Sequence, residues 1–570
     1  MTEIKPKLRI GLLLDTLAVP AWVRKMTARI AASDYAELVL IVTDDTPPRD
    51  EPSLLQRLEE RPQDLARKAL RQGLSALIWT RSGKRPQALD AFAPSIIDDI
   101  VADTPRVAVC PVRTRWSDKF SDEDLATIRS YQADVLIRIG FRILRGGILT
   151  VARYGVWSYH HGDNQVNRGG PPGFWEAVEG WPVTGCTLQQ LSEDLDNGLT
   201  LARTWATTVS ESVNANNQPT YWKSLSLIPR QLKMLHQKGA ERYFAEARAA
   251  EPHPHLYSRR LYRSPGKAEL LRLLSRKIWR YLRRTVVKHF YYDQWILLFH
   301  LSDGFSSSLW RYTRLEPPAG SIWADPFVLQ RGASYFIFFE DLQFLKGNGR
   351  ISVVSIDESG KVGVPVAALQ TDHHLSYPFV FEADGQTYMI PESRAAHCIS
   401  LYRCVEFPTR WVKVMNLMEN VEAVDATLHF HDGRWWLFVN MMENLGASTW
   451  DELFVFHAEH FATQNWVPHA LNPVVSDVRT SRPAGRLFVR DGKLYRPSQD
   501  SSHRYGWALN INLVEQLDPG RYSEKTVSKA YPSWAPDVVG VHTYNTAGRM
   551  NVIDAQVRRR RWPVFGPKRY

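Results

Sequence analysis

The stretch YGVWSYHHGDNQVNRGGPPGFWEAVEGWPVTGCTLQQLSEDLDNG covers residues 154–198. It contains more side chains suited to catalysis or binding, at defined spacings, than any other part of the chain. It is dense in glycine and proline. An apolar run, Val135–Ile139, precedes it, and a second, Thr187–Leu191, lies towards its end. Loops at the ends of buried strands usually carry the site of an α/β domain. We therefore expect the functional site here.

The residues before this stretch alternate between strand-like and helix-like segments. Apolar runs predict strands at 8–14, 36–42, 76–79, 106–110 and 134–139, helical spacing predicts helices at 21–32, 54–74 and 122–132, and residues 44–52 read as a proline-rich loop. Such alternation predicts an α/β domain over residues 1–250, with a Rossmann-like parallel sheet covered on both faces. The first strand lacks a following GxGxxG fingerprint, so no dinucleotide site is expected.

Composition sets broad limits on the function of this 570-residue chain. Aromatic residues make up 11%, with 20 Trp, which fits either stacking on sugar rings or a large aromatic core. The four cysteines (110, 186, 398 and 404) form no CxxC pair, so neither a disulfide scaffold nor a metal site is expected. We find no signal-peptide pattern and no apolar run of spanning length, and we expect a cytoplasmic protein.

The net charge of +11 is concentrated in two segments. Residues 251–294 read as a linker that contains one helix, and residues 270–288 hold seven basic residues and no acidic one. This helix fits either an interfacial helix on the inner, anionic face of a membrane or a helix packed between domains with a solvated basic face. The second segment is a basic tail at 558–570. Neither has the interleaved aromatic residues of a nucleic-acid module, so no nucleic-acid partner is expected.

Residues 295–557 show a weak repeat of an apolar strand, a glycine turn and an aromatic strand. The turn glycines are Gly332, Gly385, Gly433 and Gly492, which are separated by 53, 48 and 59 residues. Three of these turns are Asp-Gly, a strong hairpin signal. Repeats near 50 residues predict a β-propeller, and a closing unit at residues 540–545 brings the number of blades to five.

Several motifs of the first domain resemble the formyltransferase catalytic domain that methionyl-tRNA and sugar N-formyltransferases share. They are DVLIRIGFRILRGGIL at 134–149, Gly155, Ser158-x-His160, Arg168-Gly169, Pro172, Thr184-Gly185-x-Thr187 and Leu195-Asp196-x-Gly198. The resemblance is densest over residues 134–200. It implies transfer of a formyl group from 10-formyltetrahydrofolate to a primary amine.

The resemblance also implies site residues. His160 and Asp196 match the catalytic His and Asp, while Ser158 stands where the family has the Asn that donates to the oxyanion. A hydroxyl also donates, and losing such a donor costs roughly 2.7–4 kcal/mol of barrier; Asn164 and His161 are candidate substitutes. GDNQ replaces the family's SLLP after this His, which predicts a different pocket. The residues expected to bind substrate or cofactor are His161, Asp163, Asn164, Arg168, Gly169 and Gly170.

The second domain is similar to the propeller that accompanies plant glucosamine inositolphosphorylceramide transferase, and to five-bladed arabinofuranosidase and xylosidase hydrolases. The motifs are Trp323-Ala-Asp325-Pro-Phe, Leu375-Ser-Tyr-Pro-Phe, Met389-Ile-Pro-Glu392-Ser, Asp425-Ala-Thr and Ser481-Arg482-Pro-Ala-Gly. By this likeness Asp325 matches a hydrolase base, and Glu392 and Asp425 are candidates for the other two carboxylates. Arg482 stands where an acid would serve hydrolysis, which favours a glycan-binding module.

Together these patterns predict an enzyme that formylates the amine of an amino sugar. The sugar would be linked to a nucleotide or a lipid, in cell-envelope polysaccharide synthesis. Two alternatives remain. The propeller could act as a glycosidase or glycosyltransferase, or the chain could be a non-catalytic scaffold for glycan assembly, which Ser158 and the basic tail would suit.

Overall fold

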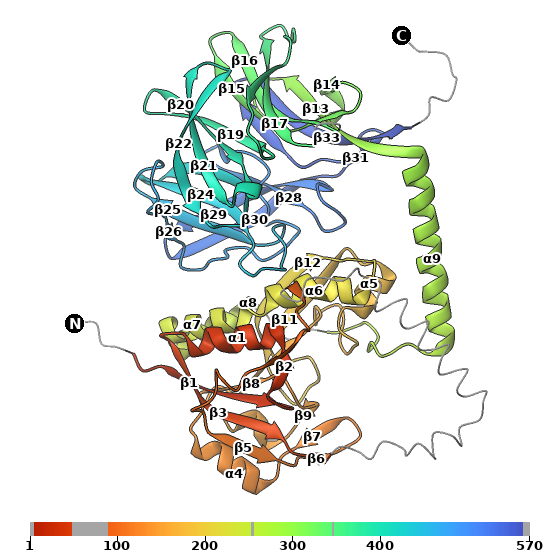
Figure 1. The fold of residues 1–570 in the computed structure, drawn as a ribbon, viewed down its shortest axis with the longest axis vertical. Coiled ribbons are helices and arrows are strands. Elements are labelled where there is room, and N and C mark those ends of the chain that lie inside the picture. The colour runs from red at the N-terminus through yellow and green to blue at the C-terminus, as the bar shows by residue number, and fades with distance from the viewer. Residues whose placement is uncertain (1–4, 48–88, 252–255, 345–346, 562–570) are drawn as a thin grey trace. The chain divides into compact units, whose positions relative to one another are not determined.

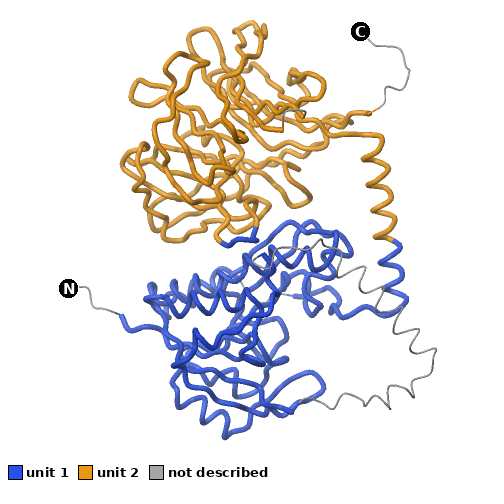
Figure 2. The backbone as a smooth tube through the Cα atoms, in the orientation of Figure 1, with its two compact units in different colours: residues 1–275, 444–447 blue, residues 276–443, 448–570 orange. Residues whose placement is uncertain are grey.

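The computed structural model divides the chain into two compact units, residues 1–275 with 444–447 and residues 276–443 with 448–570 (Figure 2). It describes residues 5–47, 89–251, 256–344 and 347–561. The predicted helix at 54–74 and strand at 76–79 lie outside the described residues, as do most of the predicted loop at 44–52 and the tail from residue 562.

The first unit is built on a seven-stranded sheet with the order β12-β11-β10-β8-β1-β3-β5 (Figure 1). The strands are β1 (Leu8–Leu14), β3 (Ala36–Asp44), β5 (Arg106–Val109), β8 (Val135–Arg138), β10 (Val156–His160), β11 (Val183–Gln190) and β12 (Leu199–Thr207). The first five run parallel, and the predicted strands at 8–14, 36–42, 106–110 and 134–139 are confirmed within one or two residues.

The last two strands of this sheet were not predicted as a hairpin. β11 pairs antiparallel with both β10 and β12. Only residues 191–198 connect β11 to β12, which is too short for the crossover that a parallel neighbour needs. The sheet is therefore parallel with an antiparallel edge. Smaller strands and a 3₁₀ turn flank it: β2 (Ala18–Pro20), β4 (Pro94–Ile96), β6 (Val112–Arg113), β7 (Ser117–Lys119), β9 (Ile143–Leu144) and η2 (Gly147–Thr150).

Helices cover both faces of the sheet because successive strand residues point to opposite sides. On β1, Leu12 packs into one hydrophobic cluster and Leu13 into another. Helices α1 and α7 contribute to the first cluster and α4 to the second. Among the described residues, the helices that lie wholly in this unit are α1 (Ala21–Ala31), α4 (Asp122–Ser130), α5 (Phe174–Glu179), α6 (Val213–Ser224), α7 (Leu227–Lys238) and α8 (Ala240–Ala250).

The second unit consists of five antiparallel sheets, the blades of a propeller (Figure 1). Four blades are continuous in sequence: β15–β18, β19–β22, β23–β26 and β27–β30. The fifth joins both ends of the unit, because β13 (Tyr291–Leu301) pairs antiparallel with β33 (Met550–Arg560) along its whole length. This pairing closes the predicted ring of five blades.

The remaining propeller elements have the following bounds. They are β14 (Thr313–Leu315), β15 (Ser321–Arg331), β16 (Ser334–Gln343), β17 (Gly349–Asp357), β18 (Val366–Leu369), β19 (Ser376–Ala383), β20 (Gln386–Glu392), β21 (Cys398–Glu406), β22 (Arg410–Glu419), β23 (Ala423–His431), β24 (Arg434–Met441), β25 (Leu453–Ala458), β26 (Val467–Pro468), β27 (Phe488–Arg490), β28 (Lys493–Asp500), β29 (Ala508–Asp518), β30 (Arg521–Ala530), β31 (Val538–Gly540) and β32 (Tyr544–Ala547), with 3₁₀ turns η3 (Leu309–Arg311) and η4 (Arg394–Ala396).

The predicted glycine turns are hairpin turns between the first two strands of each continuous blade. At Asp384-Gly385 both residues have positive φ, 50° and 70°, and the other two Asp-Gly turns repeat this. That conformation is the type I′ turn that matches strand twist. In the closing blade the corresponding turn is at Gly548, so the unit predicted at 540–545 takes in the start of the hairpin strand β32 but not its turn.

Helix α9 (Lys267–Phe290) lies within the predicted linker and contains the predicted basic helix. The division between the units falls inside it, at residues 275 and 276. β13 begins four residues before the predicted start of the propeller at 295, and β33 takes in the first three residues of the predicted tail. In the part of the chain that the structure describes, no helix has the length and apolar character needed to cross a bilayer.

Gly385 gives a test of the hairpin geometry. Its φ is +70° and a Cβ would meet nothing within 4 Å, so backbone strain is the cost of a side chain there. We expect Gly385→Val to lower the free energy of unfolding by about 1–2 kcal/mol, measured by chemical denaturation. Gly385→Asn is the matched control and should cost less, because Asn tolerates the left-handed region. Equal losses in the two variants would contradict this explanation.

Candidate functional site

Two neighbouring strands of the first unit position the predicted centre. β10 pairs in parallel with β8, and this register sets Ser158 opposite Arg138. His160 is the last residue of β10 and pairs with Thr187 of β11. Because alternate strand residues share a face, Ser158 and His160 lie on the same side of the sheet. The functional side chains therefore project where the strands end.

His160 lies between two hydrogen-bond acceptors. Its Nε2 is 2.7 Å from the carbonyl oxygen of Asn167, and its Nδ1 is 3.3 Å from Oδ1 of Asp196. The ring is buried, which lowers the pKa of His160, but the hydrogen bond and the charge of Asp196 outweigh burial and the pKa is raised. With an acceptor facing each nitrogen, the protonated imidazolium is the favoured form.

Asp196 lies in the turn between β11 and β12 with a φ of 52°. Its Oδ2 accepts from the Gly169 amide at 3.1 Å, and the Gln189 amide group is 3.5 Å from Oδ1. Burial acts to raise the pKa of Asp196, but His160 and these donors hold it below its usual value. Gly169 has a φ of +102°, and a Cβ there would lie 2.2 Å from the Tyr262 carbonyl oxygen, so only glycine fits. His160 and Asp196 thus form a buried ion pair.

Arg138 is a site residue that the sequence reasoning missed. Its Nη1 donates to Ser158 Oγ at 3.1 Å, and its Nε and Nη2 donate to the carbonyl oxygens of Arg142 and Phe141 at 3.0 and 2.9 Å. Burial lowers the pKa of Arg138, and the charge of Asp196 is the largest opposing influence. A guanidinium has five N–H donors and keeps its charge in proteins. Two donors therefore remain after the three hydrogen bonds that the described residues show.

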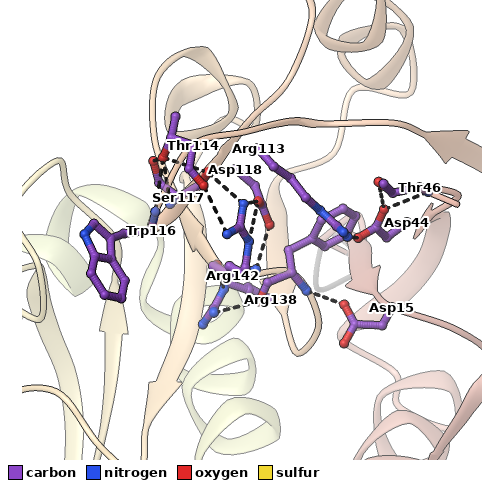
Figure 3. A network of polar contacts seen from close by, with 11 residues as sticks. Asp15, Asp44, Thr46, Arg113, Thr114, Trp116, Ser117, Asp118, Arg138 and Arg142 are labelled. Carbon is purple, nitrogen blue, oxygen red and sulfur yellow. Dashed lines mark hydrogen bonds and ion pairs between the residues drawn. The ribbon is translucent and has the colours of Figure 1, made fainter. Parts of the chain in front are cut away.

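A network of ion pairs fixes the loop that holds Arg138 (Figure 3). The Arg142 side chain donates to Oδ1 of the buried Asp118 at 2.6 and 2.8 Å. The Phe141 amide donates to Asp15 Oδ1 at 2.6 Å. At Gly140 a Cβ would lie 2.2 Å from the Asp15 nitrogen, so the loop packs directly on the end of β1. The carbonyl oxygens that orient Arg138 are thereby immobilised.

These side chains line one cavity of about 410 Å³ in the first unit. Ser158, His160, Asp196 and Arg138 form one polar part of its lining, and Ser192, Glu193 and Asp194 form another. The apolar lining includes Trp22, Ile139, Ile143, Leu144, Leu191 and Leu195. Gln189 also lines it, and its buried Oε1 has no hydrogen-bond partner among the described residues. The size and the few convergent polar groups are those of a small-molecule site.

Four residues predicted to bind substrate or cofactor lie outside the lining of this cavity and hold its loop. Asp163 accepts from the indole of Trp205 at 2.9 Å, and Asn164 accepts from Arg203 at 2.9 Å. Arg168 donates to the Asn164 carbonyl oxygen and to Asn197, each at 3.0 Å. Gly170 donates its amide to the Tyr262 carbonyl oxygen. Their role in the structure is to position the loop.

His161 lines the cavity as a neutral aromatic ring. It stacks on Tyr221 with ring centroids 3.7 Å apart and on Tyr159 at 5.4 Å. Burial and the neighbouring charge of His160 lower its pKa to about 3. His161 and Asn164 were the candidates to replace the family's Asn as donor to the oxyanion. His161 is a neutral ring and is unsuited to carry charge. The Asn164 side chain is bonded to Arg203 instead. The donor next to Ser158 is Arg138.

The propeller has its own buried charged centre, made of the four residues predicted at its mouth. Arg482 donates to Asp425 at 2.5 Å and lies 3.7 Å from Glu392. Burial and the charge of Asp425 raise the pKa of Glu392 well above its usual range. Burial raises the pKa of Asp325 to about 7, against the opposing charge of His542. The predicted carboxylates thus meet, with one of them neutralised by a guanidinium.

His542 and Asp554 complete this centre and were missed by the sequence reasoning. Carboxylate oxygens of Asp325 and Asp554 and a ring nitrogen of His542 lie within 4.8 Å of one another, a grouping that could hold a cation. The spacing of the cysteines could not have predicted this grouping, because it contains no cysteine. His542 lies between the two carboxylates, 3.4 Å from Asp325 and 2.7 Å from Asp554. They raise its pKa to about 9 despite burial, so an imidazolium supplies the positive charge there.

A pH titration tests the ion pair in the first unit. We expect Asp196→Asn to lower the pKa of His160, because the burial that opposes protonation remains while the carboxylate is lost. NMR of labelled histidine follows the titration, with His160→Gln to assign the signal. Glu193→Gln, which changes another acidic residue of the cavity lining, should leave that pKa unchanged. An unchanged pKa in Asp196→Asn would refute the pairing.

Removing one partner tests the charged centre of the propeller. Asp425→Asn leaves the buried Arg482 without its nearest carboxylate. We expect a loss of about 3–5 kcal/mol in the free energy of unfolding, measured by denaturant titration. Glu382→Gln is the control, because its pair with Arg331 is exposed and should contribute under about 1 kcal/mol. Similar losses in both variants would show that burial does not set the cost.

Comparisons with known proteins match each unit separately. Residues 316–560 match the family described as "Glucosamine inositolphosphorylceramide transferase 1, N-terminal". Glucosamine inositolphosphorylceramide transferase 1 of Arabidopsis thaliana is 33% identical over 207 residues, which are 36% of this chain and 27% of the relative. The chain thus covers about a quarter of that protein's length.

Two further matches are to a formyltransferase and to a glycoside hydrolase. Methionyl-tRNA formyltransferase of Chlorobium limicola is 32% identical over 98 residues, 17% of this chain and 30% of that protein. A GH62 α-L-arabinofuranosidase catalytic domain from Coprinopsis cinerea aligns with 46% of this chain and 84% of its own, at 11% identity and a TM-score of 0.32. The chain therefore joins a domain that resembles formyltransferases to a five-bladed propeller that resembles the N-terminal domain of glucosamine inositolphosphorylceramide transferase 1.

Proposed function

We propose that the first unit transfers a formyl group from 10-formyltetrahydrofolate to the amine of an amino sugar, linked to a nucleotide or a lipid, in cell-envelope polysaccharide synthesis. The observation that carries the proposal is the buried His160–Asp196 ion pair beside Arg138 in one cavity. The apolar lining and the spare acceptor of Gln189 suit a ring system that carries amide groups, as the donor does. That donor supplies the formyl group when it is bound.

We assign each side chain of the site a role in this reaction. Negative charge develops on the formyl oxygen during acyl transfer, and donors aimed at that oxygen lower the barrier. The two N–H groups of Arg138 that no described residue accepts are such donors. Ser158 orients Arg138, because its hydroxyl donates to the Tyr159 carbonyl oxygen and accepts from Arg138. His160 contributes positive charge rather than a hydrogen bond, since both of its ring nitrogens already face acceptors. The Asp196 carboxylate accepts the proton that the attacking amine gives up and passes it to the nitrogen that leaves with tetrahydrofolate, as the bond from the formyl carbon to that nitrogen breaks. Asp196 is then ionised again and restores the ion pair with His160. Arg138 thus takes over the part that the family assigns to an Asn.

The choice of acceptor rests on the propeller. Its relative is named for glucosamine, which is an amino sugar. The propeller centre is poorly set for hydrolysis, because Arg482 pairs with one carboxylate and His542 with another. We therefore assign the propeller a glycan-binding role in the same reaction. The rival assignment, a glycosidase or glycosyltransferase that acts through the propeller, needs Asp325 as its base.

The test is to incubate the full chain with labelled 10-formyltetrahydrofolate and nucleotide- or lipid-linked amino sugars, and to detect the formyl amide by mass spectrometry. We expect His160→Ala and Asp196→Asn to lower kcat by about 10²–10⁴. Arg138→Met should lower it by about 10²–10³. Arg106→Met is the control, because that exposed residue pairs with Asp98 away from the cavity lining.

Two outcomes would reject this assignment. Absence of both formyl amide and folate binding would exclude the proposed reaction. Loss of sugar-directed activity in Asp325→Asn, with His160→Ala fully active, would transfer the activity to the propeller.

A further inference from the structure

Helix α9 displays an apolar face that is exposed among the residues that the structure describes. Ile278, Leu282, Val286 and Phe290 follow one another at four-residue spacing, and each side chain is at least half exposed. Trp279, which is 68% exposed, flanks this row. Of the helix residues, only Leu273 and Leu274 are buried, both in its first half. A row of large apolar side chains in water is costly, and such rows mark interaction surfaces.

The opposite face of the same helix is strongly basic. Arg276, Arg280, Arg283 and Arg284 lie on it, because at 100° per residue they project away from the row of Ile278 and Leu282. The whole helix contains one acidic residue, Glu269, at its start. An apolar face rimmed by Arg and Lys, with a Trp at the border, is the pattern of a helix that lies in a membrane interface.

A second basic segment, residues 558–561, lies next to the end of α9, although it is about 270 residues away in the sequence. The amide of Arg561 donates to the Phe290 carbonyl oxygen at 2.9 Å, and its Nε donates to the Lys288 carbonyl oxygen at 3.0 Å. The end of β33, Arg558–Arg560, therefore reaches the last turn of α9. Residues 276–290 and 558–561 together hold ten Lys and Arg residues and no Asp or Glu. Arg558 pairs with Asp293 and Arg559 with Glu316, so these two carboxylates reduce the net charge of the surface to +8.

We propose that residues 276–290 bind the headgroup region of an anionic lipid bilayer, with the row from Ile278 to Phe290 inserted and Arg560 and Arg561 against the headgroups. This goes beyond the formyl transfer proposed above and does not depend on it. Charge distinguishes the possible partners of this surface. A second copy would bring a net charge of +8 against +8, whereas anionic lipid complements it. The apolar row requires a partner that also offers hydrocarbon.

The experiment is co-sedimentation of the full chain with phosphatidylcholine vesicles that contain or lack phosphatidylglycerol. We expect binding to the phosphatidylglycerol vesicles at about 0.1 M NaCl and strong weakening at about 1 M, where charge is screened within a few ångströms. The double variant Ile278→Glu, Leu282→Glu should bind at least about tenfold more weakly, because two inserted side chains are lost. Arg283→Ala with Arg284→Ala should weaken binding about 25-fold, at roughly fivefold for each charge.

Matched controls change equally exposed residues elsewhere in the second unit. Val364→Glu and Arg410→Ala should bind as the unaltered chain does, since both residues are exposed and neither belongs to residues 276–290 or 558–561. A thermal melt checks that every variant is folded. The proposal is overturned if the chain stays in the supernatant with all vesicles, if binding ignores phosphatidylglycerol and salt, or if the Ile278/Leu282 variant binds undiminished. Light scattering that shows a dimer abolished by that variant, without vesicle binding, would assign the face to a second copy.

Discussion

The site of the first unit depends on how β10 is paired. Its parallel register with β8 puts Arg138 beside Ser158, and its antiparallel register with β11 brings the β11–β12 turn back towards His160. A shift by one residue would turn Ser158 and His160 into the hydrophobic core and expose Trp157 and Tyr159. Since those two aromatic residues are buried in the core, hydrophobic packing fixes the register and thereby fixes the chemistry.

Burial then determines the charge states at this site. A buried imidazole is normally neutral, as His161 shows next to the site. His160 departs from this because Asp196 and the Asn167 carbonyl oxygen face its two nitrogens. Asp196 in turn stays ionised because backbone and amide donors reach it, and one of them depends on the glycine at position 169. The pKa values of two adjacent buried histidines thus shift in opposite directions, because Asp196 faces only one of them.

The centre of the propeller also contains buried charged groups, and it contains more of them than the site of the first unit. Asp554 on β33 accepts from the backbone amides of Asp325, His542 and Thr543, so one carboxylate ties the first blade to the last. The positive charges of Arg482 and His542 balance the surrounding carboxylates. Buried ion pairs of this kind contribute little net stability but are costly to break, so the centre acts as a constraint on blade closure.

The sequence by itself determined the elements that depend on local pattern. The strand–helix alternation, the Asp-Gly turns and the repeats depend on periodicity and turn chemistry. Each strand, helix or turn can be predicted from its own short segment of sequence. The closeness of His160 and Asp196 was expected from a resemblance. Arg138 could have been predicted as a site residue. It is a charged residue inside the apolar run Val135–Ile139, and a buried charge needs a partner.

Tertiary structure alone decided which side chains meet. The turns of β11–β12 and the left-handed backbone at Gly169 set the distances around Asp196, and no spacing in the sequence encodes them. His542 and Asp554 reach Asp325 only because β33 returns to close the ring, and Arg561 reaches α9 for the same reason. Contacts between residues more than 200 positions apart depend on how whole sheets pack, whereas a strand or a turn depends on its own few residues.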